Sequence, residues 1–598
     1  MQEFIFPSVS SEIVDNSFVT ITSQGFTDCI QVIVSERGED RKMKYYTSPS
    51  EYVRDFGEPN IKKYGQVNHN LYQWLISGGA AWILRVTDDE ATYAHAIINV
   101  GTKKAEDGLS AVIKPTVYNV ISGLSDVNAL LSEMQKNTTA DSEGFKPHAI
   151  LGFTPVGRGS YYNNYGIRLK CVDDLDSTYR SFRLYNFSLV EIVNGRESVL
   201  EGPFLVSLAE DAISDSREPL FIERVIAKYA KKIKCVFNAD AYESIGDDLD
   251  VDPDLMDITS PSLQDYQGAP NIYAHLTGGI KWATNASADS AEPNYTADPL
   301  FASFANTLRL SNGIDGDTSI NNQTAIKVAG YNGIVDPNIT DAKSTPNNVI
   351  LDGNEDTGVK DAMVKLAMSR GDCVAIVDTG FTGSPDQAIE KRDGAMAWDT
   401  YFAAIFTQDM ETYDNFAKTN IRVTSTYFLA NKIPFNDINH GRHWNFVGPR
   451  RGGVGSFENI SWLPNNANKT NLYKRQINYI EKTPKRTFFA TQLTAQTATS
   501  QMSNLSVVRT MLDIRKLAVE ISDEYKMEFI TPDTLGALQR ELQSTLSQFV
   551  SNGACESLSV SVTADAYDKT QKRCKVAISV IPTSILERIF ITLSVSNA

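Results

Sequence analysis

Residues 506–525 read SVVRTMLDIRKLAVEISDEY, and this stretch decides the fold. Its apolar residues recur at three- and four-residue spacing, which predicts a helix with one broad apolar stripe. Thr531 follows as a candidate N-cap with Pro532 at the first helical position, and leucines at helical spacing continue towards Asn552 and Gly553. The sequence therefore predicts two consecutive helices.

Three strands with period-two alternation are predicted after the helices. The first two cover about 558–562 and 574–580, and in the first one the apolar residues alternate with serines. The third is carried by four aliphatic residues close to the chain end: Ile589, Ile591, Leu593 and Val595. The last hundred residues thus have the order α-α-β-β-β.

The N-terminal part predicts an α/β arrangement. A strand over 17–22 places Val19 and Ile21 on one side and Phe18 on the other. A second strand is expected at 29–34, helices at 50–56 and 69–77, and a strand at 81–86 that is apolar nearly throughout, as in a sheet covered on both faces.

Residues 91–349 differ in character from the N-terminal part. Polar and turn-forming residues accumulate there, with strands expected at 165–171 and 181–193 and a helix at 220–229. The stretches 285–298 and 312–348 lack a long apolar run and are expected to be surface loops. We interpret the region as a β-rich insertion.

Alternating helices and strands return at about residue 350. Helices are expected at 357–369, 385–391 and 397–406, and strands at 373–377, ending in Asp378, and at 421–428. The predicted fold class is therefore α/β (α+β) and multidomain, with an α/β domain that the insertion interrupts.

Length and composition limit the function classes. The chain has 598 residues, which corresponds to roughly three to five domains. Hydrophobic residues make up 42%, as in globular proteins. The net charge of −17 disfavours nucleic-acid wrapping. The six cysteines lack CxxC spacing and are expected to be reduced thiols; no signal peptide or membrane span is expected.

Four patterns could indicate sites of chemistry, and for each the structural interpretation is favoured. Asp378 ends a strand without a glycine fingerprint and is expected to cap a turn. Residues 448–456 lack phosphate-loop spacing and suggest a basic surface loop. Aspartates alternating over 248–254 lack the calcium-loop glycine and glutamate. His440 and His443 have no further ligand in register. No catalytic, cofactor or metal residues are predicted.

The two terminal strands need a pairing partner, because an unpaired strand exposes its main-chain donors and acceptors. Each strand can pair within its own subunit. Alternatively, each adds to a sheet of a neighbouring copy, and the protein then polymerises. The residue pattern alone leaves both alternatives open.

A series of short motifs resembles the contractile tail sheath family of bacteriophages, which includes sheaths of R-type pyocins and related contractile injection systems. The motifs occur in the family's order: GGAAWILRV (78–86), NYG (164–166), LSNGIDG (310–316), YKRQINYI (473–480), KRT (485–487), IRKL (514–517), EFITPD (528–533) and the closing IP…ERI (581–589). Asp533 stands where the family usually has Asn, and Ile585 where it has a second Pro.

The resemblance implies a structural subunit of stacked hexameric rings around a tail tube, which contract to drive the tube through the host envelope. The implied organisation is an N-terminal arm (1–22), a middle α/β domain (23–90 plus 350–495), an outward-facing insertion (91–349), an inner domain (496–587) and a C-terminal arm (588–598). The arms would add strands to adjacent subunits through Phe18, Val19, Ile21, Ile589, Ile591, Leu593 and Val595. Arg540 and Gln543 are candidate tube-facing residues.

The implied partners are further copies of the chain, the tail tube protein, and the baseplate and tail terminator proteins, without direct nucleic-acid contact or membrane insertion. The implied location is the virion tail, after assembly in the bacterial cytoplasm. The alternatives are a non-contractile tube, shell or surface layer and, with less support, an α/β enzyme.

Overall fold

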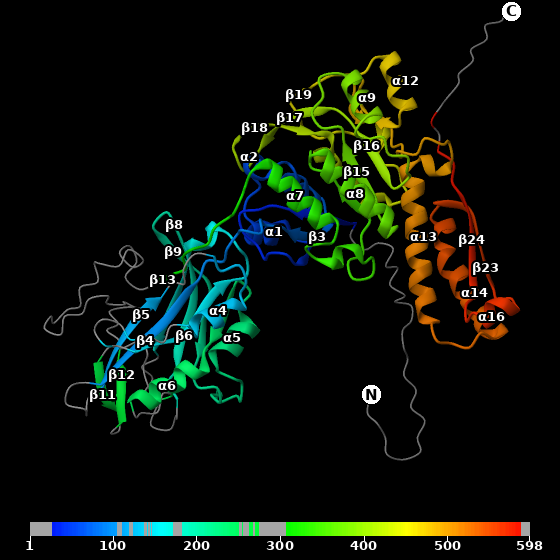
Figure 1. Ribbon diagram of the computed structural model, residues 1–598. Helices are drawn as coiled ribbons and strands as arrows, with labels where there is room; N and C mark the ends of the chain where they lie inside the picture. Colours follow the sequence, from blue (N-terminus) through cyan, green and yellow to red (C-terminus); the bar gives the residue numbers. More distant parts are fainter. Residues whose placement is uncertain are drawn as a thin grey trace, which may run out of the picture.

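The computed structural model describes residues 27–104, 111–118, 123–136, 140, 144, 146–171, 182–249, 254, 262–266, 269–273, 307–585 and 587. Within these ranges the chain mixes helices with several separate sheets, which confirms the predicted fold class. No described helix has both the length and the apolar character that crossing a bilayer requires. Figure 1 shows three parts: a central body, an inserted part on one side of it, and a C-terminal module on the other.

The body is built on a seven-stranded sheet with the order β2-β3-β1-β14-β15-β16-β20. All neighbours are parallel except β2, which is antiparallel to β3. The strands are β1 (Asp28–Ile33), β2 (Met43–Tyr46), β3 (Ala80–Arg85), β14 (Val349–Leu351), β15 (Val374–Asp378), β16 (Ala403–Phe406) and β20 (Ile477–Asn478). Because β14 pairs with β1, residues far apart in sequence form one sheet around the insertion.

Helices cover both faces of this sheet. On one face lie α1 (Pro49–Phe56), α3 (Val67–Ile76) and α10 (Ser425–His440), packed against Val349, Leu351 and Ile376. On the other lie α7 (Ile320–Tyr331) and α8 (Thr357–Arg370), packed against Ile350 and Val377. The alternation of neighbouring residues between the two cores explains why these strands are apolar throughout.

Smaller elements complete the body. They are α2 (Ile61–Tyr64), α9 (Pro385–Asp393), α11 (Gly448–Arg451), α12 (Asn466–Lys474), a three-stranded sheet in the order β18-β17-β19 (Thr419–Thr424, Asp409–Asp414 and Asn459–Ile460), and the pair β21 (Ile480–Lys482) and β22 (Thr487–Phe489).

The inserted part consists of two four-stranded antiparallel sheets around one core. One has the order β10-β6-β4-β5 (Ile233–Phe237, Lys146–Pro155, Ala96–Lys104, Ala111–Tyr118), and the other β13-β7-β8-β9 (Leu308–Arg309, Tyr165–Cys171, Tyr185–Val193, Arg196–Val206). Helices α4 (Ala129–Met134), α5 (Ile222–Tyr229) and α6 (Ala239–Leu249) and the hairpin β11–β12 (Ser262–Tyr266, Ala269–Tyr273) accompany them. The β-rich character predicted for this region is confirmed.

The C-terminal module contains the two predicted helices and two of the three predicted strands. Its elements are α13 (Leu505–Glu524), α14 (Pro532–Leu546), α15 (Gln548–Ser551), β23 (Cys555–Thr563), α16 (Ala566–Thr570) and β24 (Lys575–Pro582). Asn504 caps α13 at the Ser506 N–H, and Thr531 caps α14 at the Thr534 N–H. The expected third strand lies outside the described residues.

Three expectations about local structure are wrong. The stretch 312–348 is not all loop, since it contains α7, whose Tyr331 is buried against β1 although Ile320 at the other end is 81% exposed. Residues 397–406, expected to be a helix, contain no helix, and their last four form strand β16 (Ala403–Phe406), which is buried on both faces and therefore shows no alternation. The strand expected at 421–428 ends at Thr424, where α10 begins without a loop.

Candidate assembly surface

The C-terminal module owes its shape to one apolar core. Ile514 and Ile521 of α13 pack with Leu538, Leu542 and Leu546 of α14. Strand β23 adds alternate residues to the same core, and its serines Ser557, Ser559 and Ser561 point to solvent. The two helices thus cover a single face of the β23–β24 pair.

Helix α13 belongs to two cores at once. Leu505, Val508 and Leu512 in its first half pack into the body, whereas Ile514 and Ile521 pack into the module. A helix shared between two cores ties the position of the module to that of the body.

Polar contacts fix this helix to the body. Arg509 forms a buried ion pair with Asp437 of α10, and the Thr27 hydroxyl donates to the same carboxylate at 2.7 Å. Further along α13, Arg515 donates to the Gly371 carbonyl and Lys516 to the Asn347 carbonyl. Burial lowers the pKa of Lys516, with the nearby Asp513 opposing that shift. The attachment therefore includes a buried ion pair and further hydrogen bonds from charged side chains as well as apolar packing.

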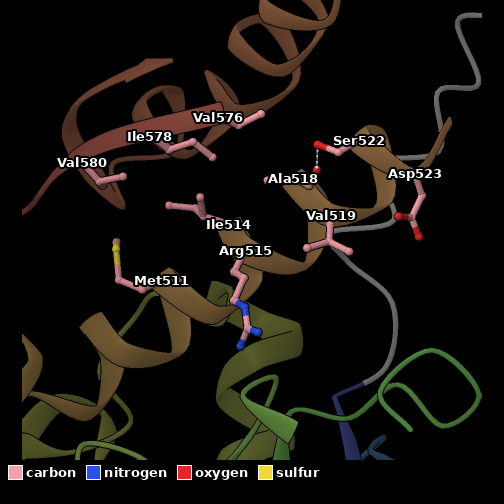
Figure 2. Close-up of a pocket in the computed structure, with 10 residues that line it drawn as sticks. All are labelled: Met511, Ile514, Arg515, Ala518, Val519, Ser522, Asp523, Val576, Ile578 and Val580. Atoms are coloured by element: carbon pink, nitrogen blue, oxygen red, sulfur yellow. Dashed lines mark hydrogen bonds between the residues drawn. The ribbon is translucent and has the colours of Figure 1, made fainter. Parts of the chain in front are cut away.

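A groove of about 460 Å³ opens between α13 and β24 (Figure 2). Val576, Ile578 and Val580 project from β24 across the groove toward α13. The α13 side and the rim are formed by Met511, Ile514, Arg515, Ala518, Val519, Ser522 and Asp523. Because Val576 is 37% and Val519 44% exposed, apolar surface on both walls is open to water. The groove is therefore a candidate binding surface for an apolar partner.

The outer edge of β24 borders this groove. In the register of the β23–β24 pair, Val576, Ile578 and Val580 lie opposite Val562, Val560 and Leu558. The outward main-chain groups of β24 have no hydrogen-bond partner within the described part of the chain. Groove and edge together offer an added strand both main-chain partners and a place for its apolar side chains.

The chain leaves β24 towards the body. The Thr583 N–H donates to the Ala554 carbonyl at 3.2 Å, and the Tyr473 hydroxyl of α12 donates to Glu587 at 2.9 Å. Figure 1 shows α12 beyond the end of α13 that enters the body, away from the groove. The last described residue is thus held at α12 and not beside the groove.

The predicted arm residues Phe18, Val19, Ile21, Ile589, Ile591, Leu593 and Val595 all lie outside the described residues. The two candidate tube-facing residues lie on α14 and differ in environment. Arg540 is exposed, whereas Gln543 is partly buried and its amide is hydrogen-bonded to the main chain of β23. No pattern in the amino-acid sequence indicates this contact.

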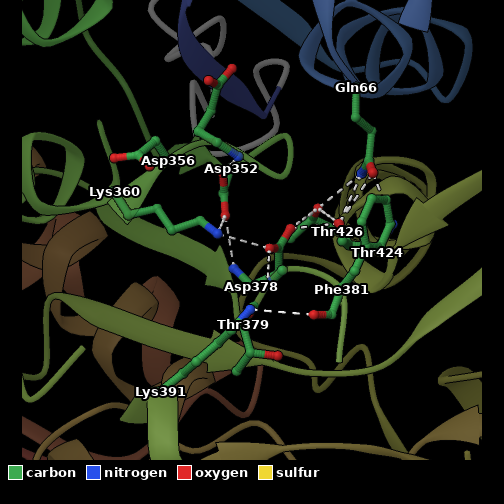
Figure 3. Close-up of polar contacts among 12 residues, drawn as sticks. Gln66, Asp352, Asp356, Lys360, Asp378, Thr379, Phe381, Lys391, Thr424 and Thr426 are labelled. Atoms are coloured by element: carbon green, nitrogen blue, oxygen red, sulfur yellow. Dashed lines mark hydrogen bonds and ion pairs between the residues drawn. The ribbon is translucent and has the colours of Figure 1, made fainter. Parts of the chain in front are cut away.

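A second polar cluster lies at the carboxyl ends of β14 and β15, where α/β proteins often bind ligands (Figure 3). The ammonium group of Lys360 lies 3.2 Å from Asp352 and 3.0 Å from Asp378, and all three side chains are buried. The hydroxyls of Thr424 and Thr426 donate to Asp378 at 2.5 and 2.9 Å.

The environment affects the two carboxylates of this cluster differently. Burial, followed by the charge of Asp378, raises the pKa of Asp352. Burial also disfavours the charged form of Asp378, but Lys360 and the two threonine hydroxyls outweigh it and lower the pKa of Asp378. Asp378 also accepts the Gly380 N–H at 2.7 Å, which confirms the predicted turn cap. The contacts of the cluster join α8, β14, β15 and α10 inside the body.

The remaining motifs are built into ordinary structure. Residues 448–451 form α11 and not a loop, with the Arg451 guanidinium over the Trp444 ring. Asp248 lies on α6, with its carboxylate 2.9 Å from the ammonium group of Lys146. His440 is the last residue of α10. The described residues contain no group of three or more His, Cys, Asp or Glu placed to hold a metal ion.

No family model and no curated protein match the sequence. Among solved structures, a sheath tail protein from Listeria innocua aligns over 93% of this chain and 95% of its own, with a TM-score of 0.48 and 8% identity. One from Desulfitobacterium hafniense aligns over 97% and 100%, at 0.45 and 10%. A PVC sheath complex of an extracellular contractile injection system, in the contracted state, aligns over 42% and 70%, at 0.36 and 16%.

These three solved structures are described as sheath proteins or a sheath complex, the class that the sequence motifs resemble.

Proposed function

We propose that this protein is the subunit of a contractile tail sheath, forming stacked hexameric rings around a tail tube and driving the tube through the host envelope when the sheath contracts. The observation that carries the proposal is the open edge of β24 beside the apolar groove. A two-stranded sheet with one open edge is an incomplete unit, and strand addition from another copy completes it.

The occupant of the groove is the C-terminal segment 588–598 of a second copy. Its four aliphatic residues share one face, which suits a groove walled by valine, isoleucine and methionine. Each such side chain contributes about 1.5–3 kcal/mol when fully buried, against about 1–2 kcal/mol per residue for ordering the backbone. In its own chain this segment follows Glu587, which is held at α12, and this favours exchange between copies.

Strand addition suits a structure that must change shape without coming apart. Main-chain pairing persists while the chain on either side of the added strand turns. A small free-energy difference per subunit between two packings, multiplied over many coupled copies, makes the transition of the whole sheath cooperative.

The placement of the other parts follows the same scheme. The inserted part and the C-terminal module lie on opposite sides of the body (Figure 1). We assign the module, with the exposed Arg540, to the inside near the tube and the inserted part to the outside. The partners are the tube, baseplate and terminator proteins, the location is the virion tail, and assembly takes place in the bacterial cytoplasm.

Electron microscopy of the purified protein tests the proposal. The expected result is polymers in two states, one long and narrow and the other short and wide. Polymers of a single length and diameter would favour the non-contractile alternative. Removal of residues 1–22 or of 589–598 is expected to leave a folded subunit, checked by its thermal unfolding, that forms no tubes. Normal tubes from either truncation would contradict the assigned arms.

A further inference from the structure

The two strands of the module differ at their outer edges. Along an antiparallel strand, successive residues direct their main-chain groups to opposite sides. In β23 the N–H groups of Val560 and Val562 and the carbonyl of Leu558 are bound by side chains of α14 and not by β24. These groups therefore form the outer edge of β23.

Two glutamines bind this edge. The Gln543 amide nitrogen donates to the Leu558 carbonyl at 3.1 Å, and its oxygen accepts the Val560 N–H at 2.8 Å. Gln539 accepts the Val562 N–H at 3.2 Å. A glutamine amide has the donor and acceptor of a peptide group, and residues four apart lie on the same side of a helix. The two side chains therefore take the place that a neighbouring strand would occupy.

Gln539 is exposed, so solvent reaches the side chain that binds the Val562 N–H at this edge. Without the two amides, Val560 and Val562 would present free N–H groups to solvent, as an open edge does. The outer edge of β24 has no such side-chain partners within the described residues.

We propose that Gln539 and Gln543 lock the β23 edge, so that the module accepts a strand from another copy only at β24. The inference rests on the proposed function, because it takes residues 589–595 of a second copy as the occupant. It assigns the incoming strand to one edge of the module, the outer edge of β24. One-sided addition gives each subunit a single attachment edge for its neighbours.

The test uses the full chain with Ile591→Asp and Leu593→Asp, which disable its own C-terminal strand; this protein is the parent chain. A synthetic peptide of residues 587–598 is titrated into it in a calorimeter, which measures the number of peptides bound per subunit. One peptide per subunit is expected. Adding Gln539→Leu and Gln543→Leu is expected to raise the ratio to two, whereas the matched control Gln548→Leu, on α15, leaves it at one. Two peptides on the parent chain, or one on the folded double variant, would overturn the lock.

Two further measurements do not depend on the fold of the double variant. In the parent chain, hydrogen exchange at Val560 and Val562 is expected to be slow without peptide, and fast exchange there would overturn the lock. Ile578→Pro removes an outward N–H of β24 without removing a bond to β23, and is expected to abolish peptide binding. Binding that persists at one peptide per subunit would show that β23 accepts the strand, which contradicts this inference and leaves strand addition itself intact. A parent chain that binds no peptide would overturn strand addition and this inference together.

Discussion

The sheet of the body and the sheet of the C-terminal module differ in how their faces and edges are covered. The seven strands of the body are covered by helices on both faces, and the N–H of Met43 on its edge strand β2 is bound by Asp336. The two strands of the module are covered on one face and open at the edge of β24. One edge strand of the first sheet is bound within its own chain, whereas under the proposed function the second sheet is completed by another molecule.

This difference predicts that the body mainly determines stability and that the module mainly determines association between copies. Charged groups in the body, such as Lys360 with Asp352 and Asp378, are buried with their partners. In the module the unused binding capacity is at the surface. Mutations in the body should therefore change the free energy of unfolding, whereas mutations at the groove should change association between copies.

The largest effect is expected for Lys360→Met. The substitution leaves Asp352 and Asp378 buried without their cation, and removing one partner of a buried ion pair costs about 3–5 kcal/mol. Chemical denaturation measures the loss. Lys365→Met on the same helix removes an exposed pair with Asp361 and is expected to cost about 0.2–1 kcal/mol. Equal effects of the two substitutions would mean that the buried cluster does not stabilise the body.

The next largest effect is expected for Leu542→Ala. Leu542 of α14 is fully buried in the core that this helix shares with α13 and β23. Truncating a buried leucine to alanine costs about 2–5 kcal/mol. Hydrogen exchange followed by mass spectrometry is expected to accelerate in α14, β23 and β24 while β15 remains protected. Equal acceleration of hydrogen exchange in β15 would contradict the distinction between the two regions, because it would show that α13 joins the module and the body into one cooperative unit.

A smaller effect is expected for Val576→Asp. Val576 faces the groove at the edge of β24, so a carboxylate there would lose water when a strand is added. The protein concentration needed for polymerisation is expected to rise about tenfold or more, equivalent to about 1.4 kcal/mol, with little change in unfolding. Light scattering measures it.

The neighbouring Ala577→Asp is the matched control for this substitution. Ala577 lies on the same strand, is exposed and does not line the groove. It is expected to leave the polymerisation threshold near that of the unmodified protein. A similar rise for both variants would mean that added negative charge, and not the groove, determines the result.

The module was the part best predicted from sequence. Helix α13 carries one uninterrupted apolar stripe, α14 begins with Thr531 and Pro532, and β23 alternates valine and leucine with serine. Each pattern reflects burial on a single face, which the sequence records directly. The prediction for strand β16 was wrong for the opposite reason, since all four of its residues are buried and the sequence shows no alternation of apolar and polar residues.

The contact of Gln539 and Gln543 with the edge of β23 could not be predicted from the sequence. Gln539 and Gln543 occupy polar positions on a helix, where such residues usually point to solvent, and the family resemblance made Gln543 a candidate tube-facing residue. Their contact with β23 depends on how closely α14 approaches that strand's edge. Likewise, Lys360 meets Asp352 and Asp378 only because β14 and β15 are neighbours in the sheet. Tertiary distance, and not local pattern, decides such contacts.

The smallest effect concerns the pH dependence of the body through His69 of α3. Its Nε2 lies 3.0 Å from Asp414, and both side chains are buried. Burial lowers the pKa of His69, although the hydrogen bond to Asp414 opposes this shift. As the pH falls below the unfolded-state pKa of about 6.5, the unfolded chain takes up the proton first. This contribution to stability is therefore complete above that pH and is lost as the pH falls toward the folded-state pKa.

The substitution His69→Gln keeps a hydrogen-bond donor near Asp414 but cannot titrate. The unmodified protein is therefore expected to lose more free energy of unfolding than the variant between about pH 7.5 and pH 5.5, by less than about 1.4 kcal/mol per pH unit. Denaturation curves of both proteins at several pH values measure the difference. A variant that loses more than the unmodified protein would show that Asp414 holds His69 in its charged form. Since His69 is not among the residues that line the groove, peptide binding at β24 should not share this pH dependence.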